Sequence, residues 1–175
     1  MTPDQLRDTI IRSCHTKEDV LRRLAFLRNY LEYRYYKQGD MPIGEYLKDK
    51  NTKVNDSAVM SSWGDDFYQS FNKDNFYMLI TQFTEGLKDN PLVTVYMPVN
   101  LDTEVLDKIG SWFQDNLDKG VLMDIRINPK IVGGCEFVWK GVSHHYTLEY
   151  FFAKKSDEIK NIISDYANTN KSNQT

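Results

Sequence analysis

The pattern of apolar and polar positions divides the chain into a helical first half and a mixed second half. The clearest helical pattern lies between about Lys17 and Lys37, where one face carries Val20, Leu24, Leu27, Leu31 and Tyr35. A second amphipathic helix is predicted after Asn72, with Phe76, Leu79, Ile80, Phe83 and Leu87 on one face. The residues up to about Asn90 are therefore predicted to be all-helical.

Helix-start signals support this division. Thr2, Pro3 and Gln5 have the order of a capping box with proline at the first helical position. A similar start, a hydroxyl followed three residues later by an acid, is present at Thr16 and Asp19. Shorter helices are predicted at 43–50 and, capped by Asp56 or Ser57, through Met60 and Trp63, with a polar loop at 49–56 between them.

Strand periodicity begins after Asp89-Asn90-Pro91. Leu92–Met97 and Val121–Ile127 alternate as half-buried strands and flank a helix expected to turn Val105, Ile109, Trp112 and Phe113 inward. A strand, a helix and a strand of these lengths predict a right-handed crossover with parallel strands. A third, antiparallel strand is expected at about 135–139, and a last helix, about Tyr146–Tyr166, is expected to cover one face of this three-stranded sheet.

These elements predict an α+β fold, with an N-terminal helical bundle followed by a small mixed βαββα sheet domain. The predicted domains are residues 1–90 and 91–166, and the polar tail 167–175 is expected to be disordered. Because the periodicity changes near Asn90, limited proteolysis is expected to release a stable fragment that begins near Leu92.

The segment Ile125–Thr147 carries most of the turn signals. It contains Asn128-Pro129, the pair Gly133-Gly134 and a second turn at Lys140-Gly141. Between the turns, Cys135, Phe137 and Trp139 share one face of a strand. The segment is predicted to be a hairpin built to pack, with no catalytic constellation.

The long helix 17–37 also has a second apolar face, formed by Phe26, Tyr30 and Tyr33. Two apolar faces fit either a helix enclosed within a bundle or a helix that offers one face to a partner. Both readings stay open at the level of the sequence.

Net charge, apolar runs and cysteine content favour no class of enzyme. The net charge is −3, from 22 basic and 25 acidic residues, which gives nucleic-acid binding no electrostatic support. No apolar run approaches the ~20 residues of a membrane span, so direct membrane insertion is not expected. Cys14 and Cys135 are interpreted as buried free thiols.

No catalytic, cofactor or metal site is predicted. Gly133-Gly134 is followed by a strand rather than by the helix N-terminus that a phosphate loop requires. His144 and His145 are adjacent on an extended segment, so their side chains should point to opposite faces. Asp65, Asp66 and Asp107 have no partner that the sequence identifies.

From Leu92 to Ile159 the order of features resembles the delta subunit of F-type ATP synthases, called OSCP in mitochondria. The matching segments are Val93–Pro98, Ile127–Gly134, Phe137–Gly141 and His145–Leu148. The family has Asp-Pro-x-Ile-Gly-Gly where this chain has Asn128 before Pro129, and Asp-x-Ser where it has His145-Tyr146-Thr147. The hydroxyl of Thr147 can still cap the final helix. The helical half aligns with no motif of the family.

The resemblance implies a stator subunit without catalysis and without a cofactor, peripheral on the cytoplasmic face of the inner membrane as part of a membrane complex. Its partners would be the N-terminal helices of the ATP synthase alpha subunit and the b-type subunit of the peripheral stalk. Phe26, Tyr30, Tyr33, Val132 and Val138 are the candidate partner-binding residues. Asn128, Pro129, Gly133, Gly134, Gly141 and Thr147 are the residues expected to build the structural motif.

Two other classes of function compete with the stator. One is a small α/β ligand-binding domain or enzyme with its site at the strand ends near Pro98 and Asn128, which would need a polar pocket with convergent ionisable groups. The other is a single-strand nucleic-acid binder that uses the many aromatic residues, which the acidic balance disfavours.

Overall fold

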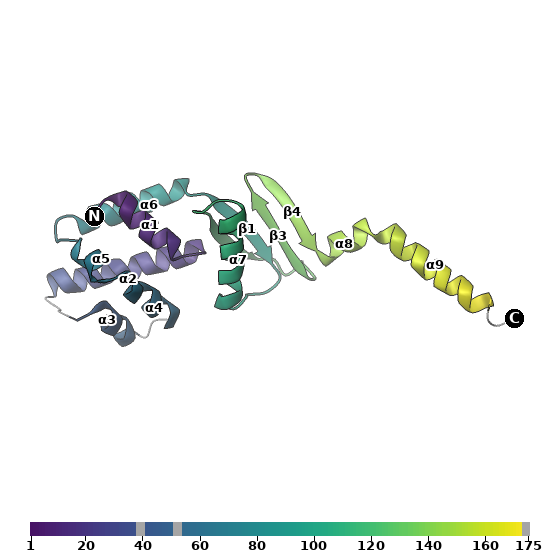
Figure 1. Cartoon of the computed structure of the whole chain (residues 1–175), viewed down its shortest axis with the longest axis horizontal. Coiled ribbons are helices and arrows are strands. Elements are labelled where there is room, and N and C mark those ends of the chain that lie inside the picture. The colour runs from purple at the N-terminus through teal and green to yellow at the C-terminus, as the bar shows by residue number, and fades with distance from the viewer. Residues whose placement is uncertain (38–40, 51–53, 173–175) are drawn as a thin grey trace. The chain divides into compact units, whose positions relative to one another are not determined.

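The computed structural model describes residues 1–37, 41–50 and 54–172. The chain forms two compact units, of which the first contains Met1–Leu92 and Asp102–Asp124 and the second contains Val93–Leu101 and Ile125–Thr175. The predicted boundary at Asn90 lies near the end of Met1–Leu92, but residues 102–124 group with the helices rather than with the rest of the sheet region. Figure 1 shows the elements of each unit.

The first unit is helical, as the apolar periodicity predicted. Its helices are α1 (Pro3–Arg12), α2 (Lys17–Tyr36), α3 (Ile43–Asp49), α4 (Val54–Ser62), α5 (Asp65–Gln69), α6 (Phe76–Gly86) with the 3-10 turn η1 (Leu87–Asp89), and α7 (Thr103–Asn116). Helix α1 lies beside α6 (Figure 1), and fully buried side chains include Leu6, Ile10, Leu27, Leu31 and Phe76. The stripe predicted on α2 is part of this core, with Val20 and Leu24 also buried.

The helix starts follow the sequence signals. The Thr2 hydroxyl accepts from the Gln5 amide and the Gln5 side chain accepts from the Thr2 amide, which completes the predicted capping box. Thr16 caps α2 by accepting from the Asp19 amide. Asn72 and Asn75 exchange the same reciprocal bonds ahead of α6, so the cap predicted at Asn72 precedes the helix by one turn.

The predicted role of Asp56 is wrong. Helix α4 begins at Val54, so Asp56 lies inside the helix rather than at its cap. Its side chain is fully buried and binds two arginines of α2. Capping statistics favour Asp before a helix, but a buried ion pair decides the position of this one. Residues 51–53 of the predicted polar loop lie outside the described residues.

The corner between α1 and α2 is held by α7 and by the start of the strand β2 (Leu122–Ile127). The Met123 amide donates to the His15 carbonyl at 2.8 Å, and the Gln114 side chain donates to the Cys14 carbonyl at 3.2 Å. Gly110 of α7 lies against His15, where an added Cβ would lie 2.3 Å from the His15 Cβ. These contacts explain why α7 belongs to the helical unit.

Within the described residues the sheet has four strands in the order β2-β1-β3-β4, where β1 is Leu92–Met97, β3 is Gly134–Trp139 and β4 is Val142–Thr147. β3 pairs antiparallel with both β1 and β4. The Leu122 amide donates to the Pro91 carbonyl, and further along both strands the Asn128 amide donates to the Met97 carbonyl. Because both partners advance in the same direction, β1 and β2 run parallel, as predicted. The fold class, α+β with helices before a mixed sheet, is confirmed.

The predicted three-stranded sheet is wrong by one strand. Residues 142–147, expected to lead directly into the last helix, form β4 and extend the hairpin. His144, His145 and Tyr146 do not give the apolar alternation by which a strand is recognised, and pairing with β3 makes them extended.

The predicted last helix is divided and does not cover the sheet. It consists of α8 (Leu148–Lys154) and α9 (Ser156–Ser172), and Phe151, Phe152, Ile162 and Ile163 on its predicted inner face are exposed. Periodicity shows that one face is apolar, but not what covers it. Helix α9 continues through Ser172 into the tail that was expected to be disordered, and 173–175 lie outside the described residues.

Two burial predictions also need correction. On α7, Phe113 is buried but Val105 and Trp112 are exposed. In β2, burial does not alternate: Leu122 and Met123 are both buried, and the end of the strand is exposed. The bond from Met123 to the α1–α2 corner accounts for the buried start of the strand. No helix in the described part of the chain combines the length and apolarity needed to cross a membrane.

Candidate functional site

The turn at Asn128-Pro129 closes the end of β2. The Asn128 amide donates to the Met97 carbonyl. The Asn128 carbonyl accepts from the Ile131 amide at 3.1 Å, and the Asn128 side-chain oxygen accepts from the Lys130 amide at 3.2 Å. Pro129 is exposed between these bonds, where it needs no donor. An asparagine can thus supply the side-chain acceptor that such a turn requires.

The two adjacent glycines are required for different reasons. A Cβ on Gly133 would lie 2.8 Å from the Leu148 Cδ1, and the Gly133 carbonyl accepts from the Leu148 amide. Gly134 has a φ of +86°, and a Cβ there would lie 2.0 Å from the carbonyl oxygen of Tyr146. The glycine pair therefore lets the start of β3 approach the end of β4.

The hairpin β3–β4 is closed by Lys140 and Gly141, with φ values of +47° and +79°. Positive φ at both central residues is the geometry of a type I′ turn, which matches the twist of paired strands. At the other end of β4, the Thr147 hydroxyl accepts from the Tyr150 amide and caps α8, as predicted. Each residue of the predicted structural motif thus has a local structural role.

The two faces of the hairpin differ in chemistry. On one face Phe137 is buried and stacks on His144, with ring centroids 4.6 Å apart, and on Tyr146 at 5.8 Å. On the other face His145 Nδ1 lies 3.1 Å from a carboxylate oxygen of Glu136. The neighbouring histidines therefore point apart, as predicted, and the described residues contain no group of three or more His, Cys, Asp or Glu able to hold a metal.

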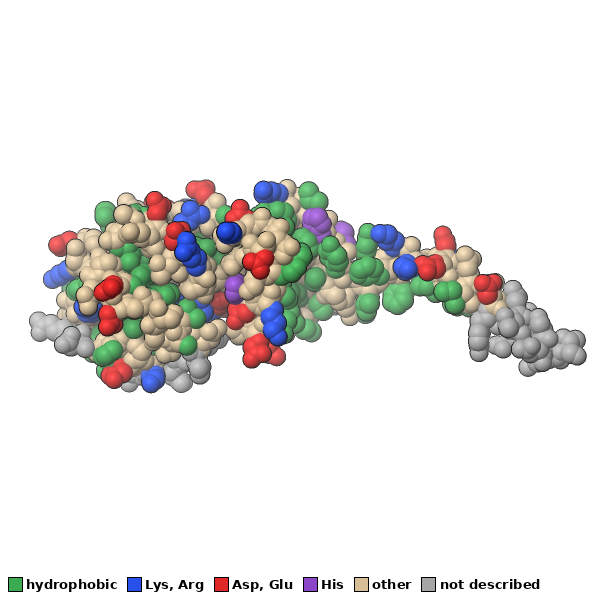
Figure 2. Space-filling model, in the orientation of Figure 1, with side chains coloured by type: hydrophobic (Ala, Val, Ile, Leu, Met, Phe, Trp, Pro, Cys, Tyr) green, Lys and Arg blue, Asp and Glu red, His purple; other side chains and the backbone are tan. Residues whose placement is uncertain are grey.

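Exposed apolar side chains gather on the hairpin and on the helix that follows it (Figure 2). We call Val142, Tyr146, Leu148, Phe151 and Phe152 the hairpin–α8 surface, and each of these residues is at least 47% exposed. A pocket of about 340 Å³ beside it is lined by Tyr146, Tyr150, Phe151 and Lys154, with Ser143, His144 and His145. Of the two valines predicted to bind a partner, Val132 is 84% exposed and Val138 is half-buried.

The predicted aromatic stripe on α2 is divided between core and surface. Tyr30 is buried, and its ring packs against Tyr46 of α3 and Tyr68 of α5, each with centroids 5.4 Å away. Phe26 and Tyr33 are half-buried, and the ring centroids of Tyr33 and Tyr46 lie 5.2 Å apart. Helix α3 therefore covers the middle of the stripe and leaves its ends accessible.

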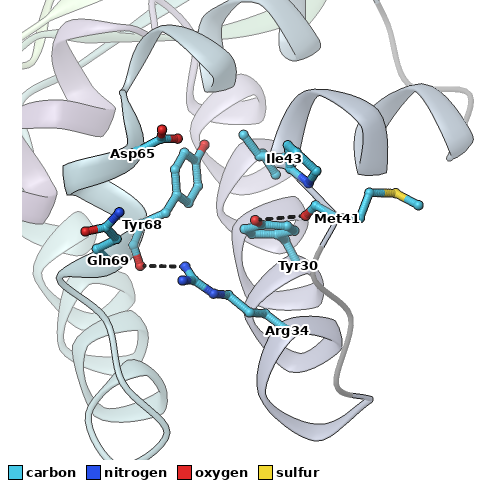
Figure 3. Close-up of a pocket in the computed structure, with 8 residues that line it drawn as sticks. Tyr30, Arg34, Met41, Ile43, Asp65, Tyr68 and Gln69 are labelled. Atoms are coloured by element: carbon cyan, nitrogen blue, oxygen red, sulfur yellow. Dashed lines mark hydrogen bonds between the residues drawn. The ribbon is translucent and has the colours of Figure 1, made fainter.

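Two pockets flank this contact. The first, about 150 Å³, lies between α2, the start of α3 and α5, where Tyr30 donates to the Met41 carbonyl and Arg34 donates to the Tyr68 carbonyl (Figure 3). Asp65 lines its opposite wall. The second, about 450 Å³, is the groove between α2 and α3 that we call the α2–α3 groove, lined by Phe26, Asn29, Glu32, Tyr33, Lys37, Tyr46 and Lys50.

A buried ion-pair network, which the sequence did not reveal, joins α2 to α4. The Asp56 carboxylate accepts from Arg22 at 2.7 and 3.0 Å and from Arg23 at 2.9 Å. Arg23 extends the network to the Ser13 carbonyl and to the Cys14 sulfur. Burial alone raises the pKa of Asp56, but the hydrogen bonds from the two arginines outweigh it and hold the pKa below its ordinary value.

The remaining candidates for chemistry are dispersed. Burial raises the pKa of the Cys14 thiol, which is 1% exposed, and also that of half-buried Cys135. Asp66 is exposed on α5 and Asp107 is half-buried on α7. With Asp65 in the first pocket, the acids that the sequence singled out do not meet in one site.

No protein-family model matches this chain, and a search of curated proteins finds no match either.

Proposed function

We propose that this chain is a non-catalytic stator subunit of an F-type ATP synthase that links the catalytic head to the peripheral stalk and resists rotor torque. The proposal rests on the resemblance of the segment from Leu92 to Ile159 to the delta-subunit family. The observation that supports it best is that the β3–β4 hairpin and α8 of the second unit carry an exposed apolar surface. Gly134 lets β3 approach β4 closely and Thr147 caps α8, and the hairpin–α8 surface lies on β4 and α8.

In this proposal the hairpin–α8 surface receives the C-terminal helix of a b-type stalk subunit. Tyr146, Phe151 and Phe152 provide large, mostly rigid side chains, which are typical anchors of helix-in-groove binding. Exposed Val132, in the turn before β3, would extend the contact. Half-buried Val138 lies on the opposite face of the hairpin, with Glu136 and His145, so it is not part of this contact. Contiguous exposed apolar side chains often mark a protein–protein interaction site.

The helical unit would bind the N-terminal helices of the alpha subunit. Phe26 and Tyr33 are the accessible members of the predicted stripe, whereas Tyr30 supports them from the core. A joint that holds during turnover needs nanomolar affinity, about 12 kcal/mol of binding free energy. The chain would then be peripheral on the cytoplasmic face of the inner membrane, held there by its partners.

Calorimetry with the C-terminal segment of the b-type subunit from the same genome tests the stalk contact. We expect nanomolar to micromolar binding to the whole chain, weakened at least tenfold by Leu148→Ser with Phe152→Ser. Leu148 is 50% and Phe152 61% exposed, so the variant should stay folded. The Leu148 side chain also lies against Gly133, and a thermal melt measures the cost of losing that contact. Val99→Ser, at an exposed valine outside the surface, is the matched control and should leave binding unchanged. Absence of binding by the wild-type chain would contradict the stalk contact.

A further inference from the structure

The α2–α3 groove combines an aromatic floor with a positively charged rim. Phe26, Tyr33 and Tyr46 form the apolar part, and Lys37 and Lys50 are exposed at its edge. The Lys50 ammonium lies 5.7 Å from the centroid of the Tyr46 ring, so charge and aromatic surface are continuous. A volume of about 450 Å³ is within the range of pockets that hold ligand side chains.

The one acid that lines the groove, Glu32, is already paired within the protein. Glu32 accepts from Arg28 at 2.9 Å and from the Tyr77 hydroxyl at 2.9 Å. These bonds, led by the one from Arg28, hold the pKa of Glu32 below its ordinary value, so it is ionised and engaged at neutral pH. The lining of the groove therefore carries two lysines and one carboxylate that is already ion-paired, although the whole chain has a net charge of −3.

We propose that the α2–α3 groove binds a peptide segment that carries acidic side chains beside aliphatic or aromatic anchors. The anchors would pack on Phe26, Tyr33 and Tyr46, and the acids would face Lys37 and Lys50. This inference rests on the proposed stator function, because it takes the head-binding segment to be the acidic partner. It adds the place of the contact and the charge of the partner.

The test uses the whole chain and a peptide spanning the N-terminal helix of the alpha subunit from the same genome. The variant Lys37→Glu with Lys50→Glu should lower the affinity at least tenfold in 50 mM salt, and raising the salt to 0.5 M should shrink this difference as screening increases. Lys48→Glu with Lys88→Glu, at two exposed lysines outside the groove, makes the same change in net charge, is the matched control and should change affinity less than twofold. A thermal melt of each variant checks that the fold is retained.

The outcomes separate the two proposals. If the peptide binds the wild type but the groove variant binds equally well, or affinity does not depend on salt, the groove proposal is overturned and the stator function stands. If neither the peptide nor the intact catalytic head binds while the stalk segment does, the groove proposal and the head contact both fail. If no synthase component binds, the stator function itself is contradicted.

Discussion

Gly134 approaches Tyr146 so closely that a Cβ on this glycine would lie 2.0 Å from the Tyr146 carbonyl oxygen, and its φ is +86°. Gly134→Ala should therefore destabilise the second unit by more than about 2 kcal/mol, because backbone strain and a clash with main chain act together. Gly141→Ala is the control: it has φ +79° but no atom within 4 Å, so only the left-handed penalty of about 1–2 kcal/mol applies. Urea unfolding followed by circular dichroism measures both, and equal losses would refute the close approach.

Because Gly110 lies against His15, replacing it with alanine should destabilise the protein, although helix propensity alone would predict stabilisation. Alanine normally stabilises a helix interior by about 0.5–1 kcal/mol over glycine. Gly110→Ala should instead cost about 1–3 kcal/mol, because its Cβ would lie 2.3 Å from the His15 Cβ. Gly86→Ala in α6, with nothing within 4 Å, should be neutral or stabilising. A higher melting temperature for Gly110→Ala would show that α7 does not pack on the α1–α2 corner.

Removing the charge of Asp56 should be costly. Asp56→Asn keeps the volume but leaves buried Arg23 without its anion, and Arg22 keeps only its pairs on α2, with Asp19 and Glu18. Removing one partner of a buried pair typically costs about 3–5 kcal/mol. Asp8→Asn breaks the exposed pair with Arg12 and should cost less than about 1 kcal/mol. Chemical denaturation of the two variants should differ accordingly, and a similar small loss in both would place Asp56 at the surface.

The same carboxyl should make the stability of the first unit depend on pH. The folded pKa of Asp56 lies below its unfolded value, so its contribution is fully present above about pH 4 and is lost as the pH falls through the folded pKa. Wild-type stability should fall below pH 4 more steeply than that of Asp56→Asn. Parallel acid limbs in the two proteins would contradict the role of this carboxyl.

Phe137 and Trp139 share a strand face, but their replacement by alanine should reduce the free energy of unfolding by different amounts. Phe137 is 8% exposed and stacks on two rings of β4, so Phe137→Ala should cost about 3–5 kcal/mol. Trp139 is half-buried under the Lys140 ammonium, 5.2 Å from its ring centroid, so Trp139→Ala should cost only about 1–2 kcal/mol. The reverse order of losses would mean that Trp139 is the core residue. A loss well under 1 kcal/mol at Trp139 would instead make it a candidate partner contact.

The sequence predicted the elements whose causes are local. The capping box at Thr2, the cap at Thr147 and the turn at Lys140-Gly141 depend on residues a few positions apart, and all three are present. The apolar stripe of α2 predicted its buried face for the same reason. Interactions between residues close in sequence were therefore enough to predict the fold class and the turns and caps of the second unit.

What the sequence missed depends on contacts between distant residues. Nothing near Asp56 indicates that Arg22 and Arg23 will enclose it, and nothing near Tyr30 indicates that Tyr46 will cover it. The same limit explains why the aromatic stripe could not be divided into core and groove before α3 was placed. It also explains the expected proteolytic boundary near Leu92, because the grouping of α7 with the helices depends on bonds from Gln114 and Met123 to the α1–α2 corner.

The central claim, that this chain joins two parts of a rotary synthase, is tested most directly by asking whether it binds both at once. The measurement is mass photometry of the isolated catalytic head and the soluble b-type stalk segment, with and without this chain. The account predicts a complex of all three components that forms only when the chain is present. Leu148→Ser with Phe152→Ser should lose the stalk segment from that complex but retain the head. A mixture in which head, stalk segment and chain stay separate would contradict the account.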